Sequence, residues 1–172
     1  LVEAVREDTS ADLLTMVGAS KEERALSSIA FVVRKRLPWL QINLLTAFLA
    51  ASVVGLFQGT IAKFTALAVL MPVVAGQSGN TGAQALAVTM RALALREVSV
   101  SHWWRLACKE IGAGAINGVA VALTTALGVV VWSGSPGLGL VIATAMVLSM
   151  VAAGFAGVIV PIVLSALGQD PA

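Results

Sequence analysis

The sequence predicts an all-α, polytopic membrane protein with four transmembrane helices, the second of them broken. Apolar residues make up 58% of the 172 residues and charged residues only 12%, whereas charged residues are about 25% of an average soluble protein. The charges are also segregated, because none occurs in residues 37–62, 64–90 or 111–169. Since a span needs about 20 apolar residues, these stretches accommodate one, one and two crossings respectively.

The first 36 residues have a different character and are predicted to be a cytoplasmic linker with amphipathic helices. Apolar residues follow Thr9-Ser10, and Ser20 to Glu23 has the spacing of a capping box before a second apolar patch. We expect two short helices here, cut from a longer cytoplasmic part that precedes Leu1. The alternative is that this segment lies on the membrane surface.

Residues 37–172 form the predicted transmembrane domain. Its four spans are expected at Trp39–Phe57, Ile61–Met90, Ile111–Trp132 and Leu138–Leu167. The second and fourth exceed the thickness of a bilayer, so we expect them to tilt, kink or protrude.

The basic residues predict the orientation. Seven of them flank the inner ends of the predicted spans, against Lys63 alone on the other side: Arg34, Lys35, Arg36, Arg91, Arg96, Arg105 and Lys109. Because cytoplasmic segments carry the excess of Lys and Arg, both ends of residues 37–172 are predicted to be cytoplasmic.

The second span contains the most informative motif, Pro72 followed by Gly76, Gly79-Asn80, Gly82 and Gln84. Proline removes a backbone donor and glycine favours departure from helical geometry, so we expect a break at which carbonyls lose their partners. Unwound backbone at membrane depth is tolerated only against protein or a water-filled cavity, where its carbonyls can bind a cation. The motif therefore predicts the wall of an ion path.

Two further polar residues belong to the third span. Glu110 follows Lys109 at the predicted membrane surface, where it either contributes to gating or ion access or simply pairs with that lysine. Asn117 lies deeper and either bonds a neighbouring helix or lines a cavity.

Other classes of function find little support. The spans contain neither His nor Asp, so no acid, base or nucleophile set can be assembled and the protein is predicted not to be an enzyme. His102 and Cys108 are the only residues of their types, which disfavours a transition-metal site. We expect membrane lipid and no nucleic acid as a partner.

The pattern Pro72, six residues, Gly-Asn-x-Gly-x-Gln resembles the hallmark of the MgtE magnesium transporters. The similarity extends to Arg91-Ala92-Leu93-Ala94, to Lys109-Glu110 with Gly112, and to the ending Leu167 to Ala172. The resemblance implies a homodimer with its ion path on the two-fold axis, a fifth helix beyond Ala172, and preceding cytoplasmic domains that sense magnesium.

What the resemblance implies is a channel or transporter for hydrated Mg²⁺ in the cell membrane, with Mn²⁺ and other divalent cations as further candidates. The residues that match the family hallmark are Pro72, Gly76, Gly79, Asn80, Gly82 and Gln84, with Gly76 and Asn80 facing the metal through a backbone carbonyl or a water. Carbonyl and amide oxygens suit Mg²⁺, which dehydrates reluctantly. The alternative is a non-conducting membrane scaffold, or a subunit that needs a partner helix to complete the pore.

Overall fold

The computed structural model describes residues 20 and 22–167, and this part of the chain is helical without strands. Its elements, in order, are α2 (Ile29–Leu56), α3 (Gln58–Lys63), α4 (Thr65–Ala94), the 3₁₀ turn η1 (Val100–His102), α5 (Trp103–Ser133) and α6 (Pro136–Ala166). The predicted all-α class is confirmed. The chain forms two compact units that meet between Lys63 and Phe64, and each is described by itself.

In the first unit, α2 begins earlier than the predicted span because Ser28 caps it. The hydroxyl of Ser28 accepts a hydrogen bond from the amide of Phe31 at 3.4 Å, satisfying one of the free donors of the first turn. The second amphipathic helix does not begin at its predicted capping box, because residues 20 and 22–28 are not helical and the apolar residues from Ile29 onward belong to the first turns of α2. The first amphipathic segment, residues 9–18, lies outside the described residues.

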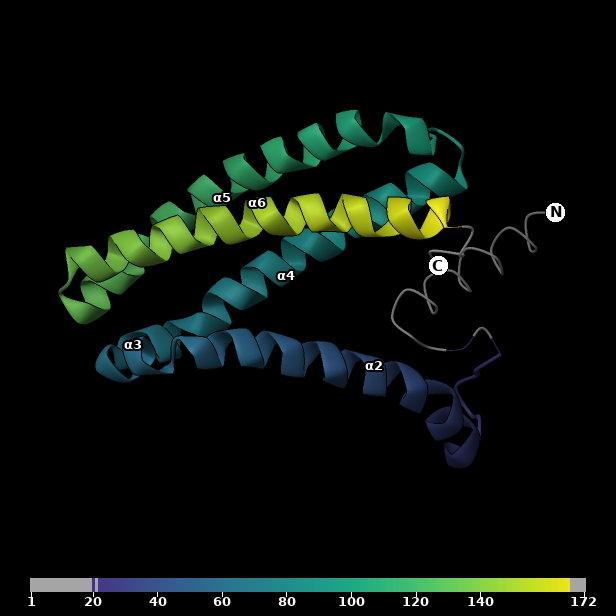
Figure 1. The fold of residues 1–172 in the computed structure, drawn as a ribbon, viewed down its shortest axis with the longest axis horizontal. Helices are drawn as coiled ribbons and strands as arrows, with labels where there is room; N and C mark the ends of the chain where they lie inside the picture. The colour runs from purple at the N-terminus through teal and green to yellow at the C-terminus, as the bar shows by residue number, and fades with distance from the viewer. Residues whose placement is uncertain (1–19, 21, 168–172) are drawn as a thin grey trace. The chain divides into compact units, whose positions relative to one another are not determined.

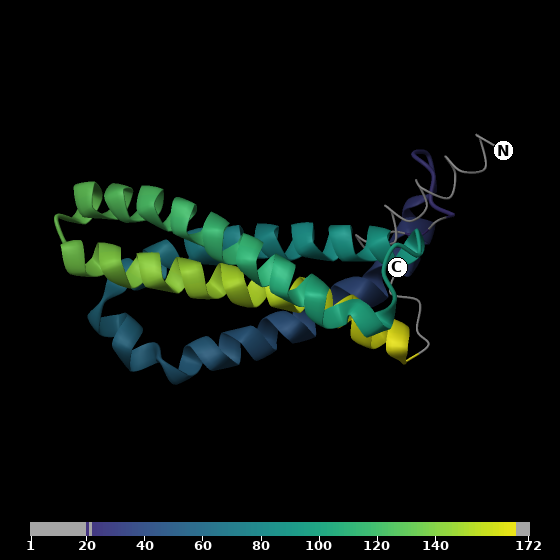
Figure 2. The ribbon, with the colours of Figure 1, turned by 90° about the horizontal axis from the view of Figure 1, so that it is seen from above.

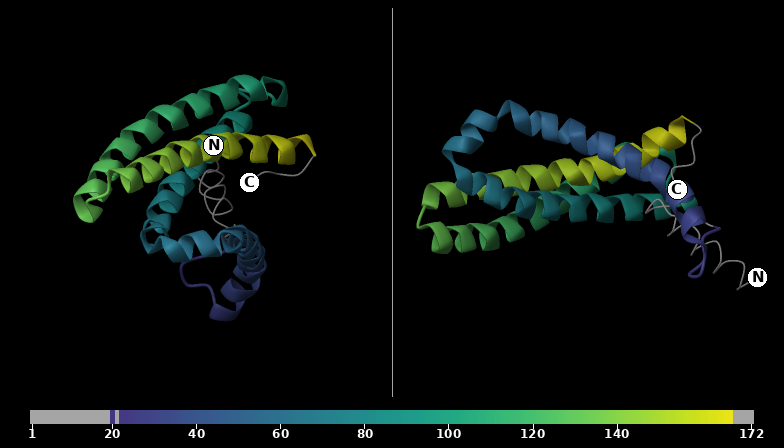
Figure 3. Two further views of the ribbon diagram at one scale, coloured as in Figure 1. Left: turned by 60° about the vertical axis from the view of Figure 1, so that its left-hand side comes forward. Right: turned by 90° about the horizontal axis from the view of Figure 1, so that it is seen from below.

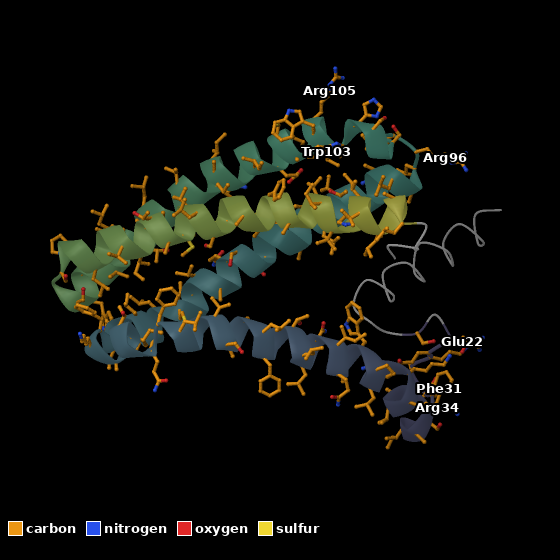
Figure 4. All side chains as sticks on the ribbon, in the orientation of Figure 1. Glu22, Phe31, Arg34, Arg96, Trp103 and Arg105 are labelled. Carbon is orange, nitrogen blue, oxygen red and sulfur yellow. The ribbon has the colours of Figure 1, made fainter. Side chains whose placement is uncertain are left out.

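Ion pairs join the turn before α2 to the helix itself. Glu22 pairs with Lys35 at 2.8 Å, and Glu23 accepts two hydrogen bonds from the guanidinium of Arg36. Figure 4 labels Glu22 beside Phe31, over whose ring the ammonium of Lys35 lies at 5.6 Å. These two ion pairs form a charged clamp at the start of α2, and no side chain of α2 is buried within its unit.

In the second unit, α5 and α6 form a tight antiparallel hairpin (Figures 1 and 3). Gly134 ends α5 in the left-handed conformation, with φ of 67°, which glycine adopts without steric cost. Ser135 then caps α6 by accepting a hydrogen bond from Leu138 at 3.3 Å, and Pro136 occupies the first turn of α6, where its missing donor is harmless.

The core of the second unit is centred on α6, which contacts both α4 and α5 along its length (Figure 2). Every cluster of buried side chains includes residues of α6: Leu70, Val129 and Ile142; Ala122, Met146 and Met150; and Ala107, Val158 and Ile162. By contrast, α4 and α5 contact each other little.

Glycines bring the backbones of these helices together. A Cβ atom on Gly114 would lie 2.8 Å from the carbonyl oxygen of Met150, and one on Gly154 would lie 2.8 Å from that of Glu110. On the other side of α6, a Cβ on Gly157 would lie 2.6 Å from the carbonyl oxygen of Gly82. Gly118, one turn after Gly114, packs in the same way, as a Cβ there would lie 3.2 Å from the Cα of Val147.

Three described helices, α2, α5 and α6, are long and apolar enough to cross a membrane. They correspond to the first, third and fourth predicted spans, with α2 and α6 each ending one residue before the predicted end. Helix α4 has 30 residues, or about 45 Å at the usual rise, but its polar residues keep it outside that group. A fourth crossing therefore stays a prediction.

The predicted break in the second span is wrong, because α4 is helical from Thr65 to Ala94 through Pro72 and all three glycines. Each glycine costs a helix about 1 kcal/mol relative to alanine, whereas each backbone group left unpaired in hydrocarbon costs several. Keeping the turns is the smaller penalty. The helical path is interrupted earlier, by the separate turn of α3 and the non-helical Phe64.

Candidate functional site

A groove of about 600 Å³ lies between α4, α5 and α6. It occupies the space left where α4 and α5 diverge, with Met150 of α6 contributing to its wall. The residues that line it are Gln77, Asn80, Thr81, Ala83, Gln84 and Ala87 of α4, Asn117, Ala120 and Val121 of α5, and Met150. Both long walls of the groove thus contribute carboxamide side chains.

The four carboxamides of the groove, Gln77, Asn80, Gln84 and Asn117, form none of the side-chain hydrogen bonds found among the described residues. The hydroxyl of Thr81 differs, because it donates to the carbonyl of Gln77 at 3.0 Å within its own helix. No fully buried side-chain nitrogen or oxygen in the described part of the chain lacks a partner. The four amides are therefore not sealed inside the protein but open to the groove. Their hydrogen-bonding capacity is available to water or a ligand.

Three of the predicted site residues come together here: Asn80, Gln84 and Asn117. Of the two roles open to Asn117, lining a cavity is the one observed. Three others are not among the lining residues, since Pro72, Gly76 and Gly79 are exposed on α4 outside the groove, and a Cβ on either glycine would meet nothing within 4 Å.

Gly82 lies on the side of α4 that packs against α6. A Cβ atom there would be 3.5 Å from the carbonyl oxygen of Ala153. Because α4 is unbroken, the carbonyls of Gly76 and Asn80 belong to the regular helical hydrogen-bonding pattern, so the side chains of the motif, rather than its backbone, face the groove.

Glu110 lies apart from the groove, seven residues before Asn117 on α5. Its carboxylate pairs with Lys109 at 2.9 Å, and its side chain is only 12% exposed against 62% for the lysine. The backbone at Glu110 also packs closely against Gly154 of α6. Of the two alternatives for Glu110, the structure therefore contains the ion pair with Lys109.

The groove carries no ionisable side chain, and the described residues contain no cluster of three His, Cys, Asp or Glu that could hold a metal directly. Its amides offer oxygen atoms that accept hydrogen bonds and N–H groups that donate them. Such groups suit a cation that keeps its water shell, as Mg²⁺ tends to do, because the waters rather than the metal contact the protein.

Gln77 and Thr81 line the groove but were not among the predicted site residues. Gln77 precedes Asn80 by three residues and Gln84 by seven, which is the spacing of one helix face. An unbroken helical period through the motif places Gln77 with the predicted site residues Asn80 and Gln84. The apolar lining residues of α5 and α6, Ala120, Val121 and Met150, could not be distinguished in the sequence from other apolar residues of their spans.

The chain is similar to known proteins over much of its length. The sequence model of the MgtE family, described as a divalent cation transporter, matches residues 71–172. A protein named magnesium transporter MgtE from Enterococcus faecalis is 31% identical over 172 residues, covering 100% of this chain and 38% of that protein.

Proteins of the same name from two other bacteria give similar matches. The one from Bacillus subtilis is 33% identical over 155 residues, or 90% of this chain and 34% of that protein. The one from Thermus thermophilus is 36% identical over 137 residues, or 80% of this chain and 30% of that protein. The chain thus spans about a third of the length of the curated relatives it matches.

Proposed function

Since the chain belongs to the MgtE family of divalent cation transporters, we propose that its amide-lined groove forms part of a path along which hydrated Mg²⁺ crosses the cell membrane. The observation that carries the proposal is the set of four carboxamides without partners among the described residues, in a unit whose packing is otherwise apolar. Leaving an amide without a partner in hydrocarbon is costly. Water and a hydrated ion would supply the missing partners.

The chemistry of the groove favours magnesium over softer metals. Mg²⁺ prefers oxygen ligands in octahedral geometry and keeps several waters, whereas copper and zinc favour thiolate and imidazole ligands, which the groove lacks. Mn²⁺ and other divalent cations of similar hydration are secondary candidates. The three relatives are named magnesium transporters, which agrees with this choice.

The proposal includes the surroundings of the path. The complete protein is a homodimer in the cell membrane, with the path at the dimer interface and Gly76, Gly79 and Pro72 on the exposed side of α4 available to it. Residues 1–36 act as a linker to cytoplasmic magnesium-sensing domains, and residues 37–172 carry transport. Both ends of that segment face the cytoplasm, so a cysteine placed at Ser135 should be labelled from outside intact cells.

Asn80 and Asn117 offer the sharpest test, because they approach the groove from different helices. A hydrogen bond to a charged, hydrated ligand contributes about 1.5–3 kcal/mol, so Asn80→Ala should weaken magnesium affinity roughly ten- to a hundredfold. Asn117→Ala should weaken it as well. If both side chains contact one hydrated ion, their losses of binding free energy should not be additive, because residues that share a ligand are coupled. The loss in the double variant should then differ from the sum of the two single losses.

The measurement is magnesium uptake into vesicles that contain the complete protein, with the yield of monodisperse protein as the folding check. Asn43→Ala, which removes an amide from α2 outside the groove lining, is the matched control. Well-folded Asn80→Ala and Asn117→Ala variants with normal uptake would reject the groove as the ion path. A wild-type protein without uptake would favour the non-conducting scaffold.

A further inference from the structure

The connection between α4 and α5 is held in place by packing beneath it. Leu93, near the end of α4, and Leu106, near the start of α5, pack against the buried cluster of Ala107, Val158 and Ile162. Three helix ends converge on this cluster. The side chains that leave the connection therefore project from a fixed base.

Helix α4 ends in a Schellman motif that places Arg96 in an unusual conformation. The amide of Arg96 donates to Leu93 at 3.1 Å and that of Glu97 donates to Ala92 at 3.0 Å, which is the bonding pattern of the motif. Arg96 has φ of 53° and is the only residue other than glycine with positive φ in the described part of the chain. Glycine is usual at this position because a side chain is strained there, so local folding does not explain the arginine.

The basic side chains of the connection are exposed, and most of them lack an acidic partner among the described residues. Arg91 in the last turn of α4, Arg96, and Arg105 in the first turn of α5 are exposed, and none forms an ion pair with another described residue. Lys109 is already paired with Glu110. The other acidic group of the connection, Glu97, lies beyond ion-pair distance of the three arginines.

Two tryptophans accompany these arginines. Trp103 and Trp104 begin α5 with exposed fractions of 40% and 59%, and their rings meet edge to face at 5.5 Å. Figure 4 shows Trp103 at the same end of the unit as Arg96 and Arg105, whose side chains point outward. Tryptophan is enriched at the headgroup level of membranes, which is also the level of lipid phosphates.

We propose that Arg91, Arg96 and Arg105, flanked by Trp103 and Trp104, form a binding surface for the phosphate headgroups of anionic phospholipids. The arginines supply charge and donor groups that match phosphate geometry, and the indoles fix their depth at the membrane surface. This surface rests on the membrane location in the proposed function but not on ion conduction, so lipid binding and transport can fail independently.

The test is native mass spectrometry of the complete, detergent-purified protein titrated with phosphatidylglycerol or phosphatidylcholine of identical acyl chains. We expect phosphatidylglycerol to bind more tightly, and each of Arg91→Gln, Arg96→Gly and Arg105→Gln to weaken it about fivefold. Raising the salt concentration should reduce the preference. Lys63→Gln, which removes one positive charge from α3, is the matched control and should leave lipid binding unchanged.

Arg96→Gly also separates charge from folding, because glycine suits the positive φ of this position and the variant should unfold at the same temperature as the wild type or higher. Equal binding of the two lipids would overturn the proposal, as would equal effects of Lys63→Gln and the arginine variants. Full displacement of phosphatidylglycerol by millimolar inorganic phosphate would identify a site for free anions instead. If the arginine variants bound phosphatidylglycerol normally but lost binding to an acidic protein segment, the surface would instead belong to that protein partner.

Discussion

The α5–α6 seam and the α4–α5 groove meet at α6 but are built from opposite choices of side chain. In the seam, Gly114 and Gly154 let the two backbones approach until a single added methyl group would collide. In the groove, α4 and α5 stay apart, and carboxamides occupy both walls. Helices in lipid associate through such close packing of small residues, so the seam accounts for cohesion and leaves the groove free to remain polar.

The contrast also separates two uses of glycine. Gly157 of α6 is buried against Gly82 and Ala85 of α4, whereas Gly76 and Gly79 of α4 face nothing within their unit. Closeness of packing, and not the presence of glycine, distinguishes the structural positions. The comparison predicts different outcomes for the same chemical change at the two kinds of position.

The largest expected effect is the difference between Gly157→Ala and Gly79→Ala. A Cβ on Gly157 would lie 2.6 Å from the carbonyl oxygen of Gly82 and 2.8 Å from the Cβ of Ala85, and overpacking of this kind costs about 1–3 kcal/mol. A Cβ on Gly79 meets nothing within 4 Å in the described part of the chain, so alanine there should stabilise the helix by about 0.5–1 kcal/mol. Thermal unfolding of the purified variants measures the difference.

Gly114→Ala tests close packing at the α5–α6 seam in the same way that Gly157→Ala tests it between α6 and α4, because a Cβ on Gly114 would lie 2.8 Å from the carbonyl oxygen of Met150. We expect it to be destabilised like Gly157→Ala. Equal melting temperatures for the variants at Gly157, Gly114 and Gly79 would contradict the distinction between closely packed and open positions of glycine.

A smaller effect is expected at Glu110, where the seam meets a charge. Glu110→Gln keeps the shape of the side chain but removes its charge from the pair with Lys109. Because the lysine is 62% exposed, the loss of stability should stay below about 1 kcal/mol. If Glu110 contributes to gating, magnesium uptake should change partially while the melting temperature holds. Uptake equal to that of the wild type over a range of magnesium concentrations would leave Glu110 with its structural pairing alone.

The smallest effect is expected at the ion pair between Glu22 and Lys35 in the first unit. This contact is charged and exposed, whereas the glycine contacts of the second unit are neutral and closely packed. A hydrogen bond from Lys35, and then its charge, lower the pKa of Glu22 below its ordinary value of 4.5. A lowered pKa means that the contact stabilises the fold above pH 4.5 and that this contribution is lost as the pH falls through the lowered value. A carboxyl NMR titration should therefore show Glu22 titrating below 4.5, and Lys35→Gln should raise its midpoint. An unchanged midpoint in that variant would exclude the pair.

The sequence predicted the helices of the second unit well because charge-free apolar runs leave few alternatives in a membrane. Helix ends depend on local signals, such as Ser28, which starts α2 of the first unit ten residues before the expected span at Trp39. The predicted break at Pro72 is wrong because the backbone hydrogen bonds kept by an unbroken helix outweigh the local preference of proline and glycine against helical geometry. Tertiary context overrode a local propensity.

The candidate site was predicted in part. Asn80, Gln84 and Asn117 were identified as polar residues in apolar spans, and all three line the groove. That α4 and α5 would present them to one another depends on how each packs on α6 through Gly82, Gly114 and Gly157. Close backbone approach leaves only a weak trace in a single sequence, since glycine is common in membrane helices.

The groove is lined by neutral side chains, which matters for its state between successive ions in the proposed transport cycle. A carboxylate at that depth would be an uncompensated charge whenever no cation was present, and charged groups inside membranes are expensive. Amides at Asn80 and Asn117 can exchange an ion for ordinary water at little cost, because water satisfies the same donors and acceptors. The groove would therefore hold no uncompensated charge when it is free of ions, which favours rapid release of the ion over its storage.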